Sequence, residues 1–173
     1  MIILVRHGRT HLNASRCLQG HVDADLDELG AQQAEAVGQY LTNEISPARI
    51  ISSPLRRAQQ TAAAIASHCG VTDVETDERW IEIDYGIYDG LPLGDVPREV
   101  WNQWRTQPNF VPEGGESFAT LHDRVHAACR ELVQSASSAD VIVVSHVSPM
   151  KSACAWARSE EHTSELQSPD HLV

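Results

Sequence analysis

The 173-residue sequence predicts an α/β protein, a three-layer α/β/α sandwich around a mostly parallel sheet. Short apolar runs of strand length alternate along the chain with segments in which apolar residues recur at helical spacing. This alternation is typical of parallel strands joined by helical crossovers, which place helices on both faces of a sheet. The length fits one domain with a sizeable core, and no internal repeat or linker separates a second one.

The predicted elements follow from apolar periodicity and from residues that begin helices. Ser53-Pro54 and Ser148-Pro149 each place an N-cap residue before a proline, and Ser117 is a third predicted N-cap. The predicted strands are 2–5, 49–52 and 141–144, and the segments 74–76 and 79–83 are expected to be extended. The predicted helices are 28–43, 53–69, one that begins at 117, and 148–157. The stretch 86–115 is rich in Pro, Gly and Trp, so we expect an irregular segment with local helix that covers the functional site.

The composition argues against several classes of protein. The formal net charge of −11 disfavours general nucleic-acid binding, which requires a basic surface. No apolar run approaches the roughly 18 residues that span a bilayer, and the N-terminus lacks the pattern of a signal peptide. The four cysteines are scattered without a C-x-x-C pair, which favours reduced thiols in a cytoplasmic protein over a disulfide or metal role.

The segment 158–168 differs in composition from the rest of the chain and resembles the translation of a common sequencing-adapter oligonucleotide. Such scars are to be left out of fold reasoning. We therefore expect residues 158–173 to be a non-native, disordered tail, and residues 1–157 to be a domain that is incomplete at its C-terminus.

Histidine and arginine residues gather at three predicted strand-to-helix junctions. Arg6-His7-Gly8 follows the first strand, Arg56-Arg57 comes after the second, and Ser145-His146 follows the strand over 141–144. In a parallel sheet the carboxyl ends of the strands share one edge, so these side chains are expected to meet in one crevice. Helix N-termini at that edge add free N–H groups, which suit an anion. The sequence therefore predicts a phosphate pocket.

Five sequence blocks occur in the order typical of one protein family. They are Arg6-His7-Gly8-Arg9-Thr10 with Asn13 and Gln19-Gly20, Ser53-Pro54-Leu55-Arg56-Arg57-Ala58, Glu82-Ile83-Asp84-Tyr85-Gly86, Gly114-Gly115-Glu116-Ser117, and Ser145-His146. In these blocks the chain resembles the histidine phosphatase superfamily, also called the phosphoglycerate mutase-like family, from Met1 to about Ala157. The resemblance implies the phosphoglycerate mutase-like form of the α/β/α sandwich.

His7 is the predicted nucleophile. A neutral imidazole nitrogen can attack phosphorus and hold the phosphoryl group covalently, and the resemblance implies the same role for His7. The positive charges of Arg6 and Arg57 are expected to lower the pKa of His7 and so keep it neutral. The second ring nitrogen is expected to donate to a backbone carbonyl, which fixes the tautomer. The two arginines can grip phosphate oxygens with planar forks, so no metal or other cofactor is predicted.

The resemblance supplies the other site assignments. Glu82 takes the position of the acid, although Glu78, Asp84 and Asp89 are close to it in the sequence. It would protonate the leaving alcohol and then activate the water that cleaves phosphohistidine. The remaining predicted phosphate- or substrate-binding residues are Arg6, Arg57 (rather than Arg56), His146, Asn13, Thr10, Gln19 and Gly20.

Three functions remain open at this point, and a phosphatase for small phosphate monoesters is favoured. A phosphoglycerate mutase of this family would carry basic residues for the substrate carboxylate in a longer segment, whereas 90–115 contains only Arg98 and Arg105. A non-catalytic phosphate-binding domain would have lost its nucleophile or its acid. Trp101 and Trp104 indicate a partly apolar leaving group. The expected partner is a small phosphorylated metabolite, with no nucleic acid and no membrane, and a homodimer is left open.

Overall fold

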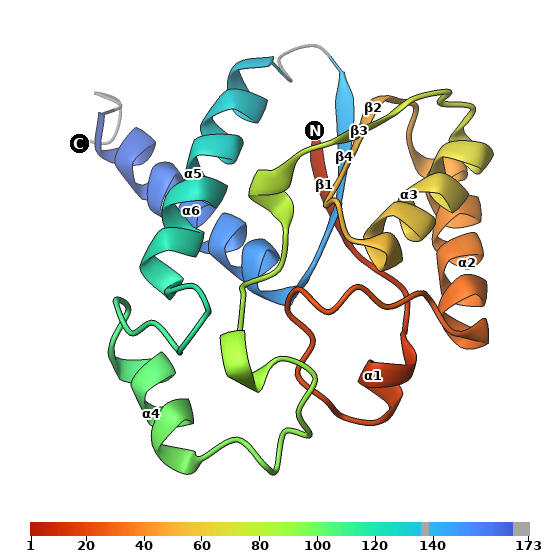
Figure 1. The fold of residues 1–173 in the computed structure, drawn as a ribbon. Helices are drawn as coiled ribbons and strands as arrows, with labels where there is room; N and C mark the ends of the chain where they lie inside the picture. The colour runs from red at the N-terminus through yellow and green to blue at the C-terminus, as the bar shows by residue number, and fades with distance from the viewer. Residues whose placement is uncertain (136–138, 168–173) are drawn as a thin grey trace.

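Four strands form one parallel sheet in the computed structural model, which describes residues 1–135 and 139–167 (Figure 1). The strands are β1 (Ile2–Arg6), β2 (Pro47–Ser52), β3 (Val74–Thr76) and β4 (Asp140–Ser145). Their order across the sheet is β1-β4-β2-β3. β1 and β4 pair in register from Ile2 opposite Val141 to Arg6 opposite Ser145. This register places the ends of two strands that carry predicted site residues side by side.

Long helices cover both faces of the sheet, as Figure 1 shows. They are α2 (Glu28–Glu44) and α3 (Arg56–Cys69) on one face, and α5 (Phe118–Ser135) and α6 (Val147–Gln167) on the other. Alternating side chains of β4 divide the core between these faces. Ile142 and Val144 pack in a cluster with residues of α2 and α3, whereas Val141 and Val143 pack with residues of α5 and α6. The predicted three-layer sandwich is confirmed.

Shorter helices surround the end of the sheet at which the strands end. They are α1 (His11–Ala14), α4 (Arg98–Thr106) and two 3₁₀ helices, η1 (Glu78–Trp80) and η2 (Gly86–Tyr88). Trp104 and Val100 of α4 pack with Leu18 and Val96 in a small core of their own. The expectation of local helix within 86–115 is confirmed. In the described part of the chain, no helix combines the length and the apolar character needed to cross a membrane.

The prediction that 79–83 is extended is wrong for its first residues, which η1 occupies. The carboxylate of Asp77 accepts a hydrogen bond from Arg79 N at 2.9 Å and so begins a turn. Trp80 is fully buried in the cluster between the sheet and the α5–α6 layer. Local capping and the burial of this large side chain outweigh the strand preference of the segment.

Two helices begin at other residues than predicted. α3 begins at Arg56 rather than directly after Ser53, whose hydroxyl binds a histidine of the candidate site. Asp23 Oδ1 accepts from Arg56 N at 2.7 Å instead. α6 begins one residue before Ser148, and the N–H of Ser148 is directed at the Glu82 carboxylate, 3.3 Å away.

α6 also extends further than predicted. It continues to Gln167, whereas the sequence predicted an end near Ala157 and a disordered tail beyond it. After the first turn of α6 the sequence contains no Gly or Pro until Pro169, so no helix-breaking residue ends the helix earlier. The rest of the predicted tail, 168–173, lies outside the described residues.

Candidate active site

His7 lies directly after β1 with a fixed tautomer. Its main chain is held by a hydrogen bond of 3.1 Å from His7 N to Ser145 O. The ring Nδ1 lies 2.7 Å from the carbonyl oxygen of Gly8. Because a carbonyl oxygen only accepts, Nδ1 carries the proton and Nε2 keeps its lone pair. This is the hydrogen bond to a backbone carbonyl that the sequence predicted.

Gly8 permits the close contact that holds this junction against the α2–α3 layer. A Cβ on Gly8 would overlap the carbonyl oxygen of Gly30 on α2. The Gly8 N–H donates to Thr61 Oγ1 on α3 at 3.0 Å. The junction that carries His7 is therefore fixed to both helices of one face.

Burial lowers the pKa of His7 from 6.5 to about 4. The hydrogen bond to Gly8 opposes this effect of burial, and the positive charges of Arg57 and Arg6 add to it. The predicted lowering of the His7 pKa by the two arginines is confirmed, although desolvation has the larger effect. The imidazole is therefore neutral at physiological pH, with Nε2 unprotonated.

This burial has a measurable consequence in the folded protein. We expect the imidazole proton signals of His7 to titrate near pH 4 in an NMR experiment. Because the unfolded chain keeps the ordinary value of 6.5, it binds more protons between these values, and stability falls as the pH drops through this window. A His7 titration midpoint near 6.5 would contradict the burial of the ring.

Arg57 and His146 lie behind His7, and both are 0% exposed. The ring centroids of His7 and His146 are 5.0 Å apart, and Arg57 Nε donates to His146 Nδ1 over 3.3 Å. Arg56 instead lies at the surface, where its guanidinium pairs with Asp25 at 2.6 Å. The structure therefore brings the three junctions together, with Arg57 as the arginine that faces inward.

The donors of Arg57 and His146 are used by protein groups. Arg57 Nη1 donates to Val22 O at 2.9 Å and Nη2 donates to Gly20 O at 2.8 Å. Because His146 Nδ1 accepts from Arg57, its Nε2 carries the proton and donates to Ser53 Oγ at 2.7 Å. Burial, together with the charge of Arg57, holds the pKa of His146 well below its usual range. Direct contact of either side chain with phosphate stays a prediction.

Glu82 is the acidic residue that lines the cavity next to His7. Its side chain is 5% exposed, and burial raises the pKa of its carboxyl. The N–H of the following residue donates to Oε1 at 2.8 Å, and the N–H of Ser148 approaches it at 3.3 Å. The neighbouring acids that do not line this cavity are Glu78, Asp84 and Asp89. The position of Glu82 thus separates it from the acids that the sequence spacing left open.

The cavity beside His7 has a volume of about 670 Å³. The predicted site residues that line it are Arg6, His7, Asn13, Gln19 and Glu82. Arg6 is exposed, and its guanidinium makes no hydrogen bond or ion pair with the described residues. The predicted site residues that do not line the cavity are Thr10, Gly20, Arg57 and His146. The structure therefore divides the predicted site into a lining and a supporting layer.

Two amide side chains of the lining have donors available. Asn13 Oδ1 accepts from Thr10 N at 3.1 Å, and Gln19 Oε1 accepts from Thr10 Oγ1 at 2.7 Å. Both amide oxygens are thus engaged, which leaves the NH₂ groups for another partner. Gln19 Nε2 is buried and has no hydrogen-bond partner. Such an orphaned donor beside a cavity is suited to an oxygen atom of a ligand.

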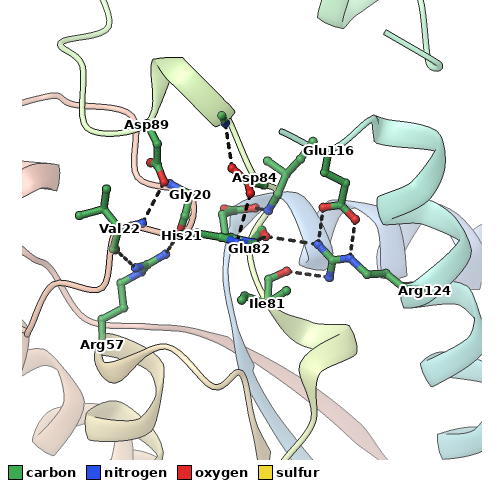
Figure 2. A network of polar contacts seen from close by, with 12 residues as sticks. Gly20, His21, Val22, Arg57, Ile81, Glu82, Asp84, Asp89, Glu116 and Arg124 are labelled. Atoms are coloured by element: carbon green, nitrogen blue, oxygen red, sulfur yellow. Dashed lines mark hydrogen bonds and ion pairs between the residues drawn. The ribbon is translucent and has the colours of Figure 1, made fainter. Parts of the chain in front are cut away.

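Arg124 on α5 holds the segment that carries Glu82, as Figure 2 shows. Its Nη1 donates to Ile81 O at 2.8 Å, and its Nη2 approaches Glu82 O at 3.3 Å. Glu116 forms an ion pair with Arg124 at 2.8 Å. Arg124 belongs to none of the five sequence blocks, although its place on an amphipathic helix eight residues after Glu116 is a signal for its role.

Asp89 ties the loop behind the site to the segment that follows Glu82 (Figure 2). Its two carboxylate oxygens accept from Gly20 N at 2.6 Å and from Val22 N at 2.9 Å. The carbonyl groups of the same two residues accept from Arg57. Asp89 therefore fixes the main chain that orients the Arg57 guanidinium.

Comparisons with known proteins place these features in a family. The model of the histidine phosphatase superfamily (branch 1) matches residues 2–171. "Probable phosphoglycerate mutase GpmB" of Yersinia pestis is 40% identical over 150 residues, which cover 84% of this chain and 68% of that protein. A bifunctional protein of Mycobacterium tuberculosis is 34% identical over 153 residues, and the match covers 87% of this chain. The chain spans only 42% of the length of that mycobacterial relative.

Solved structures resemble the fold over most of the chain. The mycobacterial glucosyl-3-phosphoglycerate phosphatase has a TM-score of 0.80 at 30% identity, covering 89% of this chain and 79% of that one. Phosphoserine phosphatase of Entamoeba histolytica, solved with 3-phosphoglyceric acid, has a TM-score of 0.81 at 27% identity. The match to the Entamoeba protein covers 91% of this chain and 79% of that one.

Proposed function

This chain belongs to the histidine phosphatase superfamily, and on that premise we propose that it hydrolyses small phosphate monoesters through a phosphohistidine on His7. One observation carries the proposal. The Nε2 lone pair of His7 is free at neutral pH, because Nδ1 donates to Gly8 O and burial lowers the pKa of the ring to about 4. His7 lines a cavity that Arg6 and Glu82 also line.

In the first step, Nε2 of His7 attacks phosphorus, a P–N bond forms and the P–O bond to the alcohol breaks. The Glu82 carboxyl gives its proton to the leaving oxygen and becomes a carboxylate. Burial supports this role, because the raised pKa keeps the proton on Glu82 to a higher pH than on an exposed carboxyl. The positive charge that His7 acquires is stabilised by its Nδ1–H···O hydrogen bond to Gly8.

In the second step, water attacks phosphorus and the Glu82 carboxylate takes its proton. The P–N bond breaks, the electron pair returns to Nε2 of His7, and inorganic phosphate leaves. His7 is then neutral and Glu82 protonated, so the site is ready for another turnover. No redox partner or second substrate besides water is needed.

The phosphate would be bound by the free cation and amide donors of the lining. Arg6 supplies positive charge, and the NH₂ groups of Asn13 and Gln19 supply neutral donors. Arg57 and His146 would lie beneath the bound phosphate, and Arg57 would stabilise it through the charge of its guanidinium. The positioning residues are Thr10, which orients both amides, and Gly20, whose carbonyl holds Arg57.

A phosphoglycerate mutase reaction is the second candidate. The specific observation in its favour is the 40% identity to a protein named as a probable phosphoglycerate mutase. The first step would be the same, but the phosphoryl group on His7 would pass to a second hydroxyl rather than to water. A third candidate, a phosphate-binding domain without activity, would keep the pocket and turn over no substrate.

One assay series separates these candidates. We expect the chain to release p-nitrophenol from p-nitrophenyl phosphate at the same rate with and without EDTA. Loss of activity in EDTA would contradict the metal-free mechanism. Interconversion of the two monophosphoglycerates without release of phosphate would favour the mutase. Phosphate binding without turnover of either substrate would favour the non-catalytic domain.

The compartment and the partner are part of the same proposal. Cys17, Cys69, Cys129 and Cys154 are all free thiols, which supports a reducing, cytoplasmic location. The partner would be a small phosphorylated metabolite that fits the cavity of about 670 Å³.

A further inference from the structure

The cavity beside His7 continues into a second cavity, and the two form one crevice. The second cavity has a volume of about 410 Å³. Four residues line both, namely Tyr85, Trp101, Val147 and Lys151. The second cavity extends from them along the aromatic side chains of Trp104 and Phe118, and Arg105 also lines it. A leaving group attached to a phosphate at His7 has room to extend in this direction.

Two cations besides Arg6 line the cavity next to His7, namely Arg16 and Lys151. Neither side chain makes a hydrogen bond or an ion pair with residues 1–134 or 139–159. The acidic residue in the lining is Glu82, and burial raises the pKa of its carboxyl, which disfavours a compensating negative charge. The crevice therefore carries unpaired positive charge in a chain whose net charge is −11.

Arg16 is held at the cavity by a backbone conformation that a side chain rarely adopts. Its φ is +58°, in the left-handed region, which residues other than glycine rarely adopt. The conformation is fixed on both sides, since Arg16 N donates to Asn13 O at 3.1 Å and Arg16 O accepts from Leu93 N at 3.0 Å. Strain of this kind persists where the surroundings impose it, and it concentrates at ligand sites.

Lys151 is the one lysine of the 173-residue chain. It projects from α6 into the part of the crevice that both cavities share, whereas Arg16 comes from the loop after α1. The two cations thus approach the crevice from elements far apart in the sequence. A lysine ammonium is a point charge on a flexible stem, so it can pair with an anion in more than one position.

The charges exceed what one phosphate group requires. In the proposed function the phosphate dianion is matched by Arg6 in the lining and Arg57 beneath it, which leaves Arg16 and Lys151 without a counterion. We infer that the leaving alcohol carries a second anionic group, a carboxylate or a phosphate, which Arg16 and Lys151 bind while its apolar part lies against Trp101. This inference rests on the proposed function and names the substrate class for the same site.

The test compares aryl phosphates that differ in one group. The substrates are para-carboxyphenyl phosphate, para-phosphonomethylphenyl phosphate and, as the neutral reference, para-carbamoylphenyl phosphate. We expect kcat/KM to be about fivefold higher for at least one of the two anionic substrates than for the neutral reference. A difference of this size is what one or two partly exposed ion pairs contribute. The anionic substrate with the higher kcat/KM identifies whether the second group of the natural substrate is a carboxylate or a phosphate.

The variants Lys151→Met and Arg16→Met are each expected to reduce this preference, and the double variant to remove it. Arg130→Met is the matched control, because Arg130 is an exposed arginine of α5 that lines neither cavity, and it should keep the preference. Equal kcat/KM for all three substrates in the parent chain would overturn the inference. A preference that survives in the double variant would overturn it as well.

A binding measurement separates this inference from the proposed function. Calorimetry with para-carboxybenzylphosphonate, para-phosphonomethylbenzylphosphonate and their para-carbamoyl analogue requires no turnover. Tighter binding of either anionic compound, lost in the double variant, supports the inference even if no substrate is hydrolysed, in which case only the proposed hydrolysis fails. Equal affinity for all three compounds contradicts the inference even if hydrolysis is fast.

Discussion

Replacing His7 with glutamine is expected to lower kcat for p-nitrophenyl phosphate by about 10⁴-fold or more, because the atom that bonds to phosphorus is lost. The main-chain hydrogen bonds of the junction, from His7 N to Ser145 O and from Gly8 N to Thr61 Oγ1, do not involve the imidazole, so the junction after β1 stays in place. The measurement is a steady-state rate on purified variant, with the thermal midpoint recorded beside it. A folded variant with little activity is the predicted outcome.

His11→Gln is the matched control for this variant. His11 is an exposed histidine at the start of α1, four residues from His7, and it does not line the cavity. Its variant should keep the rate of the parent chain. Unchanged activity in His7→Gln would show that His7 is not the nucleophile, whatever the rate of the control.

Replacing Glu82 with glutamine is expected to affect substrates according to their leaving groups. An alkyl phosphate such as glycerol phosphate needs a proton on its leaving oxygen, so kcat should fall by about 10²- to 10³-fold. The p-nitrophenolate ion leaves without protonation, so the first step with p-nitrophenyl phosphate should fall much less. The measurement is the pre-steady-state release of p-nitrophenol compared with the single-turnover rate on the alkyl ester.

The pH dependence of the Glu82 variant gives a second readout. In the parent chain, activity on the alkyl ester should decline as the pH rises through the raised pKa of Glu82, because the general acid loses its proton. Glu82→Gln should lack this alkaline decline. Glu78→Gln is the control, since Glu78 is exposed and lies outside the cavity. Equal losses on both substrates would contradict the role of Glu82 as acid.

The strand β4 could be predicted because it is buried on both faces. The run 141–144 is apolar at every position, and the structure buries all four residues between the two helical layers. The segment 79–83 combines apolar residues with the charged Arg79 and Glu82, and Asp77 turns the chain there through a local hydrogen bond. Such a side-chain contact is not visible in periodicity, and the same holds for the short α1, which Thr10 and Asn13 cap.

The site was predictable only where its residues lie in contiguous blocks. His7 and Glu82 stand in such blocks, and the structure places both at one cavity. No sequence motif contains both Arg16 and Lys151. They line one cavity only because the fold brings α6 close to the loop after α1. The sequence also could not show that carbonyls of the loop at Gly20 would hold the Arg57 fork.

The most direct test of the account is to identify the phosphorylated residue. Glu82→Gln should form phosphohistidine with p-nitrophenyl phosphate and then hydrolyse it slowly, because the base that activates water is missing. Rapid quenching in alkali, which preserves phosphohistidine, followed by mass spectrometry of the peptides should find one phosphoryl group on His7. A phosphoryl group on His146, or turnover without any phosphorylated histidine, would contradict the account.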